Sequence, residues 1–587
     1  MTAMDFNLKN DKFWFGLVFA LALVVRLLRL GEVPLSEAEA SWALQAFDLT
    51  RGLPVDFGPQ PGYINLTALV FFVLQASNFA ARFIPALAGA ALVLAPFFFR
   101  DKLGEKAALT LAFLLAFEPG LLALSRQAGS PILAVSLLLL AWGTWRTGYV
   151  RLSGFLAGLA LLSGSALYFG LAGLGLAFAL TRVFVPQAFF SFEQERARPA
   201  LFFALGTYLV FGSLFLFAPG GLAAGLAGLL GLFNGLLDWN GVYFWQLPLA
   251  LLVYQFPALI LTLVSLARLF QRRDPLVIFL GSWLLTSLLV ASIFPSRQVS
   301  DLIWTLIPLS ALAALEIVRW LIPIASVAEL QAFPDEQGSG EAELRPVVIT
   351  NGVWETLGVT ALTAILLAFS WLNFTGVALI TFDPAATQMR WLVTAGALVL
   401  LVLSVILVAF GWSIRVAAQG FAWGGLASLA VYSLAMASFS ANLRPLPTVE
   451  MWPDGPQSPA AGVLLDQVRE LSLLSHGADA SLKITLVGFD SPAVRWLLRD
   501  WRVITAQALS FESVSDIIIT PGNAFPPELE AAYRGAIFPW RSYPVWGQAS
   551  TSEWLRWVSI HDLPQSQETL LLWARSDLFP DSQNPVP

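Results

Sequence analysis

Cysteine is absent from the 587-residue sequence, histidine occurs only twice, and charged residues make up only 12% of the chain. Soluble proteins carry about twice that share of charge, so a soluble fold is excluded for most of the chain. The sequence offers no thiol nucleophile and no disulfide, and both histidines, His476 and His561, follow the last long apolar run. Any chemistry in the apolar part therefore depends on carboxylates, arginines and hydroxyls. The net charge of −6 gives no footprint for nucleic acid.

Long apolar runs recur from Phe13 to Ser438, and the mean hydropathy of the chain is +0.71. Runs of roughly 18 residues are long enough to cross a hydrocarbon core of about 30 Å. These runs are apolar on every face, as in helices buried by lipid and by one another. We predict a polytopic α-helical membrane protein with about 13 transmembrane helices. The predicted spans are 13–30, 83–99, 107–124, 131–146, 152–164, 167–185, 200–217, 246–270, 276–294, 302–325, 354–380, 391–411 and 417–438.

One further apolar segment, 62–77, is short and interrupted by Asn65, Thr67 and Gln75, so it either crosses the membrane or lies at its surface. Treating it as a surface helix places the larger share of the lysines and arginines on one side of the membrane. Cytoplasmic loops carry that excess. The sequence therefore predicts a cytoplasmic amino terminus and an exterior carboxyl-terminal region.

Polar segments divide the chain into two predicted domains. Residues 1–438 form a transmembrane domain, with a first outer loop at 31–82 that carries interfacial helices and an acidic cytoplasmic linker at 326–353. Residues 439–587 alternate strand and helix patterns, which predicts a small exterior soluble α/β domain. Its strand patterns are at 483–487, 502–505 and 516–520, and its helical patterns are at 463–474 and 493–500. The glycine-rich stretch 220–225 is predicted to be a flexible or re-entrant outer loop.

The most informative motif follows the first predicted span. Ser36 is expected to cap a helix whose first turn holds Glu37 and Glu39, which places both carboxylates at the positive end of the helix dipole. Further landmarks are Gln60-Pro61-Gly62-Tyr63, Asn78-Phe79-Ala80-Ala81-Arg82, Arg100-Asp101-Lys102-Leu103-Gly104, Pro119 and Ser125-Arg126. In this order and spacing, residues 13–150 resemble the GT-C superfamily of membrane glycosyltransferases. That superfamily holds the protein O-mannosyltransferases and the lipid A aminoarabinose transferases.

The resemblance implies a GT-C-like transferase in a bacterial inner membrane. Such an enzyme moves a hexosyl or pentosyl group from a polyprenyl-phosphate-linked donor to an acceptor on the outer face of the membrane. The implied catalytic residues are Glu37 and Glu39, the implied ligands of the donor phosphate are Arg297, Arg82 and Arg126, and the implied lining of the substrate pocket is Gln60, Tyr63, Arg26 and Arg29. On this hypothesis the Glu-bearing segment and Arg297 share one water-accessible pocket. The implied partners are the bilayer, the lipid-linked sugar and a glycan, protein or lipid acceptor.

Three positions depart from the family pattern, and one of them is Gln60, which lacks the charge of the usual His or Lys. Ala38 stands where the family has a catalytic aspartate, and Ser130 stands at the second acidic position, so we expect no divalent metal and no other cofactor. The departures leave an alternative open, a catalytically inactive relative that acts as a scaffold in lipid-linked glycan assembly. Breaks in the apolar runs near Gly164 and Gly220 leave a transporter as a further alternative.

Overall fold

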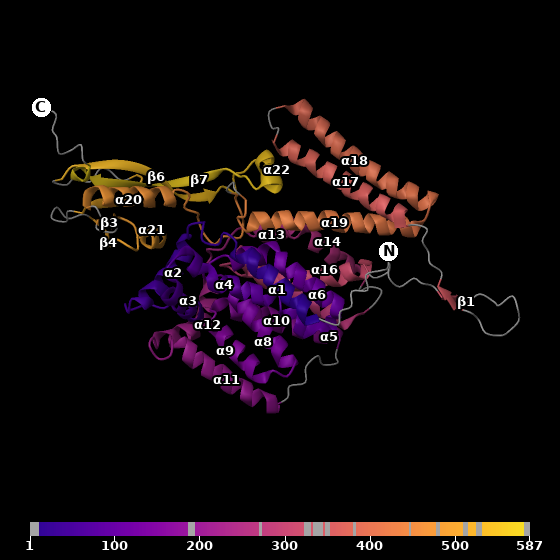
Figure 1. Ribbon diagram of the computed structural model, residues 1–587, viewed down its shortest axis with the longest axis horizontal. Helices are drawn as coiled ribbons and strands as arrows, with labels where there is room; N and C mark the ends of the chain where they lie inside the picture. Colours follow the sequence, from indigo (N-terminus) through magenta and orange to yellow (C-terminus); the bar gives the residue numbers. More distant parts are fainter. Residues whose placement is uncertain are drawn as a thin grey trace.

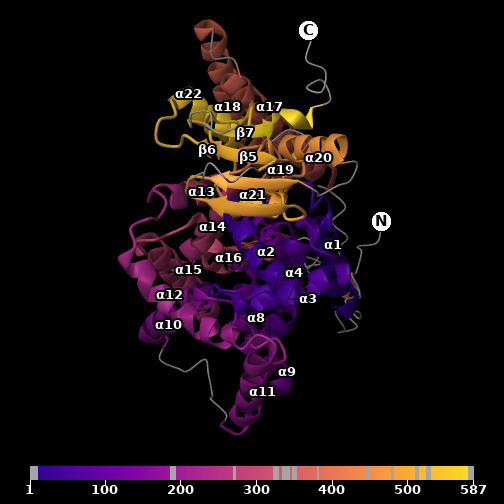
Figure 2. The same cartoon turned by 90° about the vertical axis from the view of Figure 1, so that its left-hand side faces the viewer.

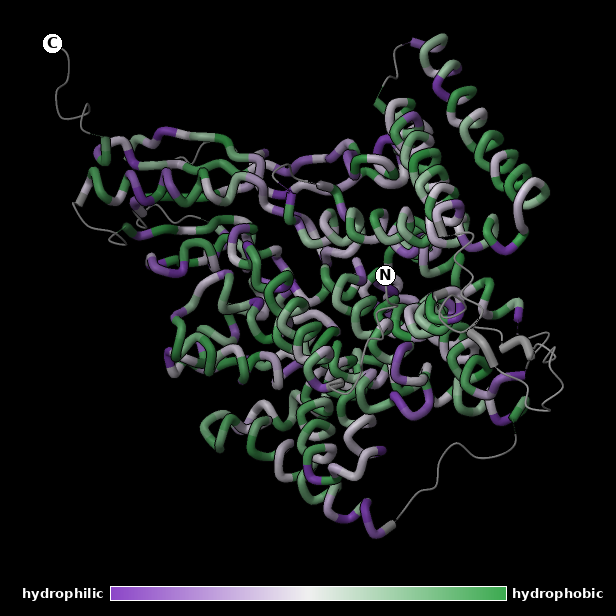
Figure 3. The backbone as a smooth tube through the Cα atoms, turned by 45° about the vertical axis from the view of Figure 1, so that its right-hand side comes forward, coloured by the Kyte–Doolittle hydropathy of each residue, from purple (hydrophilic) through white to green (hydrophobic). Residues whose placement is uncertain are grey.

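The computed structural model describes residues 11–185, 194–268, 273–321, 330–332, 344–346, 353–379, 383–444, 448–476, 482–508, 515–523 and 531–579. Helices form the body of the molecule, and the carboxyl-terminal residues form a β-sheet with three helices at one end of that body (Figures 1 and 2). Apolar residues run along the helices of the body, and hydrophilic and apolar residues alternate in the carboxyl-terminal part (Figure 3).

The helices of the body suit a membrane. Eight helices of the described chain are long and apolar enough to cross one, or up to ten if each of two bent pairs is one span. The chain is therefore a multi-pass helical membrane protein, as predicted, and the number of thirteen spans stays a prediction. The helices that pass this test without a bend are α4 (Asn78–Leu92) continued to Leu103 through η2 (Ala95–Phe99) and α5 (Arg100–Leu103), α10 (Ser165–Phe184), α12 (Gly220–Leu237), α15 (Pro275–Ile293), η4 (Val299–Leu302) with α16 (Ile303–Leu321), α17 (Val353–Leu379), α18 (Pro384–Gly411) and α19 (Ile414–Ser440).

The other helices of the body are shorter or less apolar. They are α1 (Asp11–Leu27), α2 (Glu37–Thr50), α3 (Pro61–Leu74), α8 (Ile132–Arg146), α9 (Val150–Leu161) and α11 (Gln194–Gly212). Most of the predicted acidic linker at 326–353 lies outside the described residues. Within it the structure describes one antiparallel pair of strands, β1 (Leu330–Ala332) and β2 (Leu344–Pro346).

Two predicted spans are bent at polar residues. Helix α6 (Glu105–Phe117) meets α7 (Pro119–Ser125) at 56°, and α13 (Gln246–Tyr254) meets α14 (Phe256–Ala267) at 93°. Glu118 and Gln255 occupy the two breaks, and the Gln255 amide donates a hydrogen bond to the Glu118 carboxylate. Glu118 also caps α7 by accepting from the Gly120 and Leu121 amides. The polar groups freed at the two breaks therefore find partners within the protein.

The prediction of a flexible or re-entrant loop at 220–225 is wrong. Gly220 begins the 18-residue helix α12, whose buried face carries Gly221, Ala224, Gly225 and Gly228. A Cβ atom at Gly221 would lie 2.2 Å from the Gly212 carbonyl oxygen, so the glycine lets α12 pack closely against α11. The glycines therefore serve helix contact, as small residues commonly do between membrane helices.

The carboxyl-terminal part is a five-stranded mixed sheet. Its strand order is β4-β3-β5-β7-β6, in which β3 is parallel to β4 and β5, and β7 is antiparallel to β5 and β6. The elements are α20 (Ala461–His476), β3 (Lys483–Val487), α21 (Pro492–Leu497), β4 (Arg502–Ala506), β5 (Ile517–Pro521), β6 (Tyr533–Pro544), α22 (Thr551–Ile560) and β7 (Gln565–Arg575), followed by η6 (Ser576–Leu578). The predicted strands coincide with β3, β4 and β5, whereas the long β6–β7 pair was not predicted.

Candidate functional site

The amino terminus of α2 fixes the orientation of both candidate acids. The Ser36 hydroxyl accepts from the Glu39 amide at 3.3 Å, and the Glu39 carboxylate accepts from the Ser36 amide at 3.0 Å. This capping box confirms the predicted cap at Ser36. Successive helical residues are turned by about 100°, so Glu37 and Glu39 point to nearly opposite sides of the helix.

Glu39 is buried in a two-pronged ion pair with Arg82. The Arg82 Nε and Nη2 atoms lie 2.7 Å from the two carboxylate oxygens of Glu39. The Ala128 amide donates a further hydrogen bond at 2.9 Å. Burial raises the pKa of Glu39, but the charge and hydrogen bonds of Arg82, with the amides of Ala128 and Ser36, outweigh it, so the net pKa is lowered. Glu39 is therefore held as a carboxylate.

Arg82 uses its remaining donors on the backbone of the first outer loop. Its Nη1 atom donates to the carbonyls of Leu30 at 3.2 Å and Val33 at 2.7 Å, and Nη2 donates to that of Pro34 at 3.1 Å. With the two bonds to Glu39, these equal the five N–H groups of a guanidinium. Arg82 thus ties α4 to the chain that leads into α2.

Glu37 contacts the carboxyl-terminal sheet. Its carboxylate accepts from the Ser491 hydroxyl at 2.7 Å, the Ala493 amide at 3.0 Å and the Arg541 Nε at 2.9 Å. The Trp540 indole lies at 3.4 Å. Glu37 therefore joins α2 to α21 and β6.

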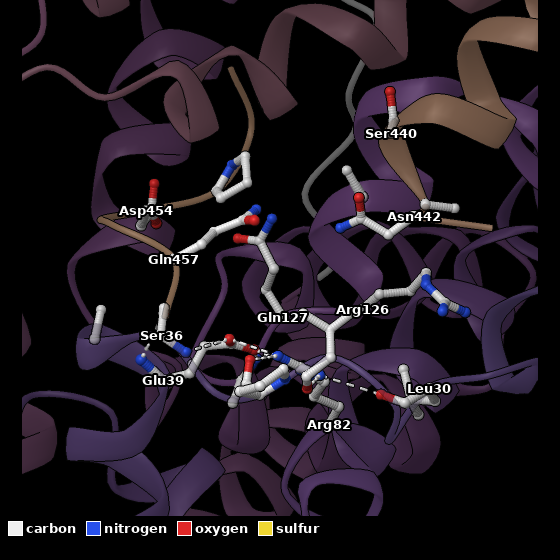
Figure 4. Close-up of a pocket in the computed structure, with 18 of the residues that line it drawn as sticks. Leu30, Ser36, Glu39, Arg82, Arg126, Gln127, Ser440, Asn442, Asp454 and Gln457 are labelled. Carbon is white, nitrogen blue, oxygen red and sulfur yellow. Dashed lines mark hydrogen bonds and ion pairs between the residues drawn. The ribbon is translucent and has the colours of Figure 1, made fainter. Parts of the chain in front are cut away.

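A cavity lies on the Glu39 side of α2. It encloses about 80 Å³, and the charged side chains in its lining are Arg29, Glu39, Arg82, Arg126 and Asp454. At about 10–15 Å³ for each water, this is room for roughly five to eight waters, or for a group the size of a phosphate. Figure 4 shows Asp454 and Gln457 on one side of the cavity and Arg126 on the other, with the Glu39–Arg82 pair below both in this view.

Arg126 is the cavity arginine without a carboxylate partner among the described residues. Its Nη1 atom donates to the carbonyls of Val25, Arg26 and Leu28, at 3.2, 2.8 and 2.7 Å. Arg82 is paired with Glu39, and Arg29 with Glu32 at 2.6 Å. Burial, followed by the charges of Arg82 and Arg29, lowers the pKa of Arg126 to about 10. The positive charges of Arg126, Arg82 and Arg29 repel one another, and an anion in the cavity would offset this repulsion.

Asp454 enters the cavity from the segment that follows α19, and sequence reasoning missed it. Its position gave no signal, because Trp452-Pro453-Asp454-Gly455 reads as an ordinary turn. A second cavity of about 310 Å³ lies beside the first, and Pro453 and Gln457 line both. Polar and aromatic side chains of the second lining include Gln246, Tyr543, Trp546 and Gln565.

Four of the predicted site residues lie elsewhere. Arg26 is fully buried and bonds the Ser125 hydroxyl and three helix carbonyls. Gln60 donates to the Gly129 carbonyl at 3.0 Å, Tyr63 to the Ala81 carbonyl at 2.8 Å and Arg297 to the Phe294 carbonyl at 3.2 Å. None of the four lines either cavity.

The expectation that Arg297 shares a pocket with the Glu-bearing segment is therefore corrected. The Val242 amide donates to the Arg297 carbonyl at 2.9 Å, and the Gly241 backbone packs against the Arg297 side chain. The roles predicted for individual side chains stay predictions. In the described part of the chain, no group of three or more His, Cys, Asp or Glu side chains could hold a metal ion.

Comparison with solved structures decides the fold. ArnT from Cupriavidus metallidurans, an aminoarabinose transferase bound to undecaprenyl phosphate, is 13% identical with a TM-score of 0.56, and the match covers 98% of this chain and 100% of that one. The chain has the GT-C fold. The same transferase in its apo state matches at 13% identity and a TM-score of 0.51, over 98% of this chain and 99% of that one. The oligosaccharyltransferase of Archaeoglobus fulgidus matches at 12% identity and a TM-score of 0.42, over 84% and 65%.

The GT-C resemblance predicted from the first outer loop is thus confirmed at the level of the fold. No protein-family model matches the sequence, and no curated protein does.

Proposed function

We propose that this protein transfers a sugar from a polyprenyl-phosphate donor to an acceptor on the outer face of a bacterial plasma membrane, with its amino terminus in the cytoplasm and its sheet outside. The observation that supports this most is the cavity on the Glu39 side of α2, where Arg126 presents a guanidinium without a carboxylate partner in the described chain. A GT-C fold shared with ArnT, which was crystallised with undecaprenyl phosphate, makes a lipid phosphate the natural anion for that cavity.

Arg126 and Arg29 are the proposed ligands of the donor phosphate. Guanidinium groups present forked N–H donors that match phosphate oxygens, and both side chains line the cavity. As the bond between sugar and phosphate breaks, negative charge grows on the leaving phosphate, and fixed positive groups stabilise it. Arg82 also lines the cavity and contributes its positive charge, although its N–H groups already donate to Glu39 and to backbone carbonyls. Arg297 stays a second candidate for the phosphate.

The two predicted catalytic acids, Glu37 and Glu39, lie in different surroundings, so we propose different roles for them. Glu39 borders the cavity, where it orders Arg82 and the amide of Ala128. Glu37 is directed at the sheet, and a role as base would require it to leave Arg541. The matched substitutions Glu37→Gln and Glu39→Gln test both, because each removes one charge and keeps the size of the side chain.

Binding of the lipid is the experiment that tests the proposal. Wild-type protein in nanodiscs is titrated with undecaprenyl phosphate and, as a neutral control, with undecaprenol. We expect the phosphate to increase affinity at least about tenfold, since a charge-assisted hydrogen bond contributes about 1.5–3 kcal/mol. We expect Arg126→Gln to abolish that preference. Equal affinity of the wild type for the two lipids would overturn the proposal.

A catalytically inactive scaffold is the second candidate function. Ala38 and Ser130 favour it, because the family's acids are missing at those two positions. A scaffold would bind undecaprenyl phosphate yet release none from any lipid-linked sugar. Deleting the sheet would then disrupt an assembly, whereas Glu39→Gln would leave that assembly intact.

A further inference from the structure

The segment 448–457 is held tightly over the cavity. The Val449 carbonyl accepts from the Trp557 indole at 2.7 Å, and Glu450 accepts from the Tyr254 hydroxyl at 2.7 Å. Trp452 is fully buried, and a Cβ atom at Gly120 would lie 2.5 Å from its ring. The backbone that carries Pro453 and Asp454 into the cavity is therefore fixed by contacts with α7 and α13 of the body and with α22 of the carboxyl-terminal part.

Asp454 lies where the two cavities meet. It lines the phosphate-sized cavity, and its neighbours Pro453 and Gly455 line the larger one. The larger cavity offers amides from Gln246 and Gln565 and the ring of Trp546, a combination that suits a hydroxyl-rich molecule. The Asp454 carboxylate therefore borders the phosphate-sized cavity, and the backbone on either side of it borders the larger one.

The surroundings of Asp454 suit a proton acceptor. Burial, and to a smaller extent the charge of Glu39, raise the pKa of Asp454 to about 6, although the Ser300 hydroxyl donates a hydrogen bond to it. The other charged groups around it are Asp301 on η4 and the cavity arginines Arg29, Arg82 and Arg126. A base with a pKa just below the working pH is both ionised and strong enough to take a proton.

Glu39 is the less suitable base of the two acids in this cavity. Its carboxylate accepts four hydrogen bonds, two of them from Arg82, and its pKa is lowered. A carboxylate stabilised in this way binds a proton weakly. For Asp454, the only hydrogen bond within the described residues is the one from Ser300.

We propose that Asp454 is the general base of the transfer and that the segment 448–457 completes the active site. This inference rests on the proposed glycosyl transfer. The acceptor oxygen attacks the anomeric carbon of the sugar and forms the new glycosidic bond. The bond from that carbon to the phosphate oxygen breaks, and its electron pair stays on the polyprenyl phosphate. The acceptor proton passes to the Asp454 carboxylate, which later gives it to water.

The test compares Asp454→Asn with Asp466→Asn, the same substitution at a side chain of the sheet region that is 78% exposed. Each protein is assayed for binding of undecaprenyl phosphate and for its release from a panel of undecaprenyl-phosphate sugars that carry glucose, mannose, galactose, arabinose or aminoarabinose. We expect Asp454→Asn to bind the lipid like the wild type and to lose at least about 100-fold in turnover. Asp466→Asn should match the wild type in both assays.

A pH profile separates a base from a merely structural residue. Wild-type turnover should rise with pH through an apparent pKa of about 6, and Asp454→Asn should lose that limb while Asp454→Glu keeps it, shifted. Unchanged turnover in Asp454→Asn, with lipid binding intact, would overturn this inference and leave the proposed function standing. Failure of the wild type to bind the lipid or to release it from any sugar of the panel would overturn both.

Discussion

Replacing Arg82 with alanine removes the cation that neutralises a buried carboxylate. The Arg82 and Glu39 side chains are 6% and 9% exposed, and their charged atoms are 2.7 Å apart. Breaking a buried pair by removing one partner costs about 3–5 kcal/mol, because the other charge stays buried and uncompensated. The substitution also frees the carbonyls of Leu30, Val33 and Pro34. We therefore expect Arg82→Ala to lower the stability of the whole first outer loop.

The assay is the change in tryptophan fluorescence on heating in detergent, for which the chain provides 22 tryptophans. Arg29→Ala is the matched control, because Arg29 and Glu32 form an ion pair in the same loop with side chains 41% and 54% exposed. Exposed pairs contribute little to stability, so this control should melt like the wild type. Equal melting temperatures for Arg82→Ala and Arg29→Ala would refute the reasoning.

The pair also predicts a dependence of stability on pH. The folded pKa of Glu39 is lowered, so its contribution is present above the ordinary carboxyl range and is lost as pH falls through the folded value. The melting temperature of the wild type should therefore fall with acidification by more than that of Glu39→Gln. Parallel curves for the two proteins would contradict this sign.

Three further substitutions test separate parts of the site. Arg126→Ala should weaken binding of undecaprenyl phosphate roughly 10- to 100-fold, whereas a larger loss in Arg297→Ala than in Arg126→Ala would move the phosphate site. Glu37→Gln should speed proteolytic release of the sheet, since it weakens contacts to α21 and β6. Cleavage at the wild-type rate would show that the ion pair between Glu37 and Arg541 is dispensable. Gly120→Ala should reduce turnover but not lipid binding, because its Cβ atom would displace Trp452, and full turnover would refute the role given to that ring.

The sequence predicts those features that depend on local pattern. Apolar length predicts the membrane helices, and alternation predicts β3, β4 and β5. The capping box at Ser36 follows from residue spacing alone. Strand β6 was missed because Gly535 and Pro539 interrupt the pattern of a strand.

The contacts of the site residues could not be predicted from local sequence patterns. Glu37 and Glu39 were identified together, yet only tertiary contacts direct one to the sheet and the other to the cavity. The bends at Glu118 and Gln255 depend on a partner 137 residues away in the chain. Asp454 and Glu39 line the same cavity although they are even farther apart in the sequence, because the chain returns to the cavity only after α19. No spacing rule connects such positions.

The most direct test of the account is an experimental structure of the protein with undecaprenyl phosphate in a lipid nanodisc. We expect phosphate density in the cavity on the Glu39 side of α2, within about 2.7–3.2 Å of the Arg126 guanidinium and on the side of the cavity that Asp454 faces. Density for the phosphate beside Arg297 instead, with the Arg126 cavity empty, would contradict it.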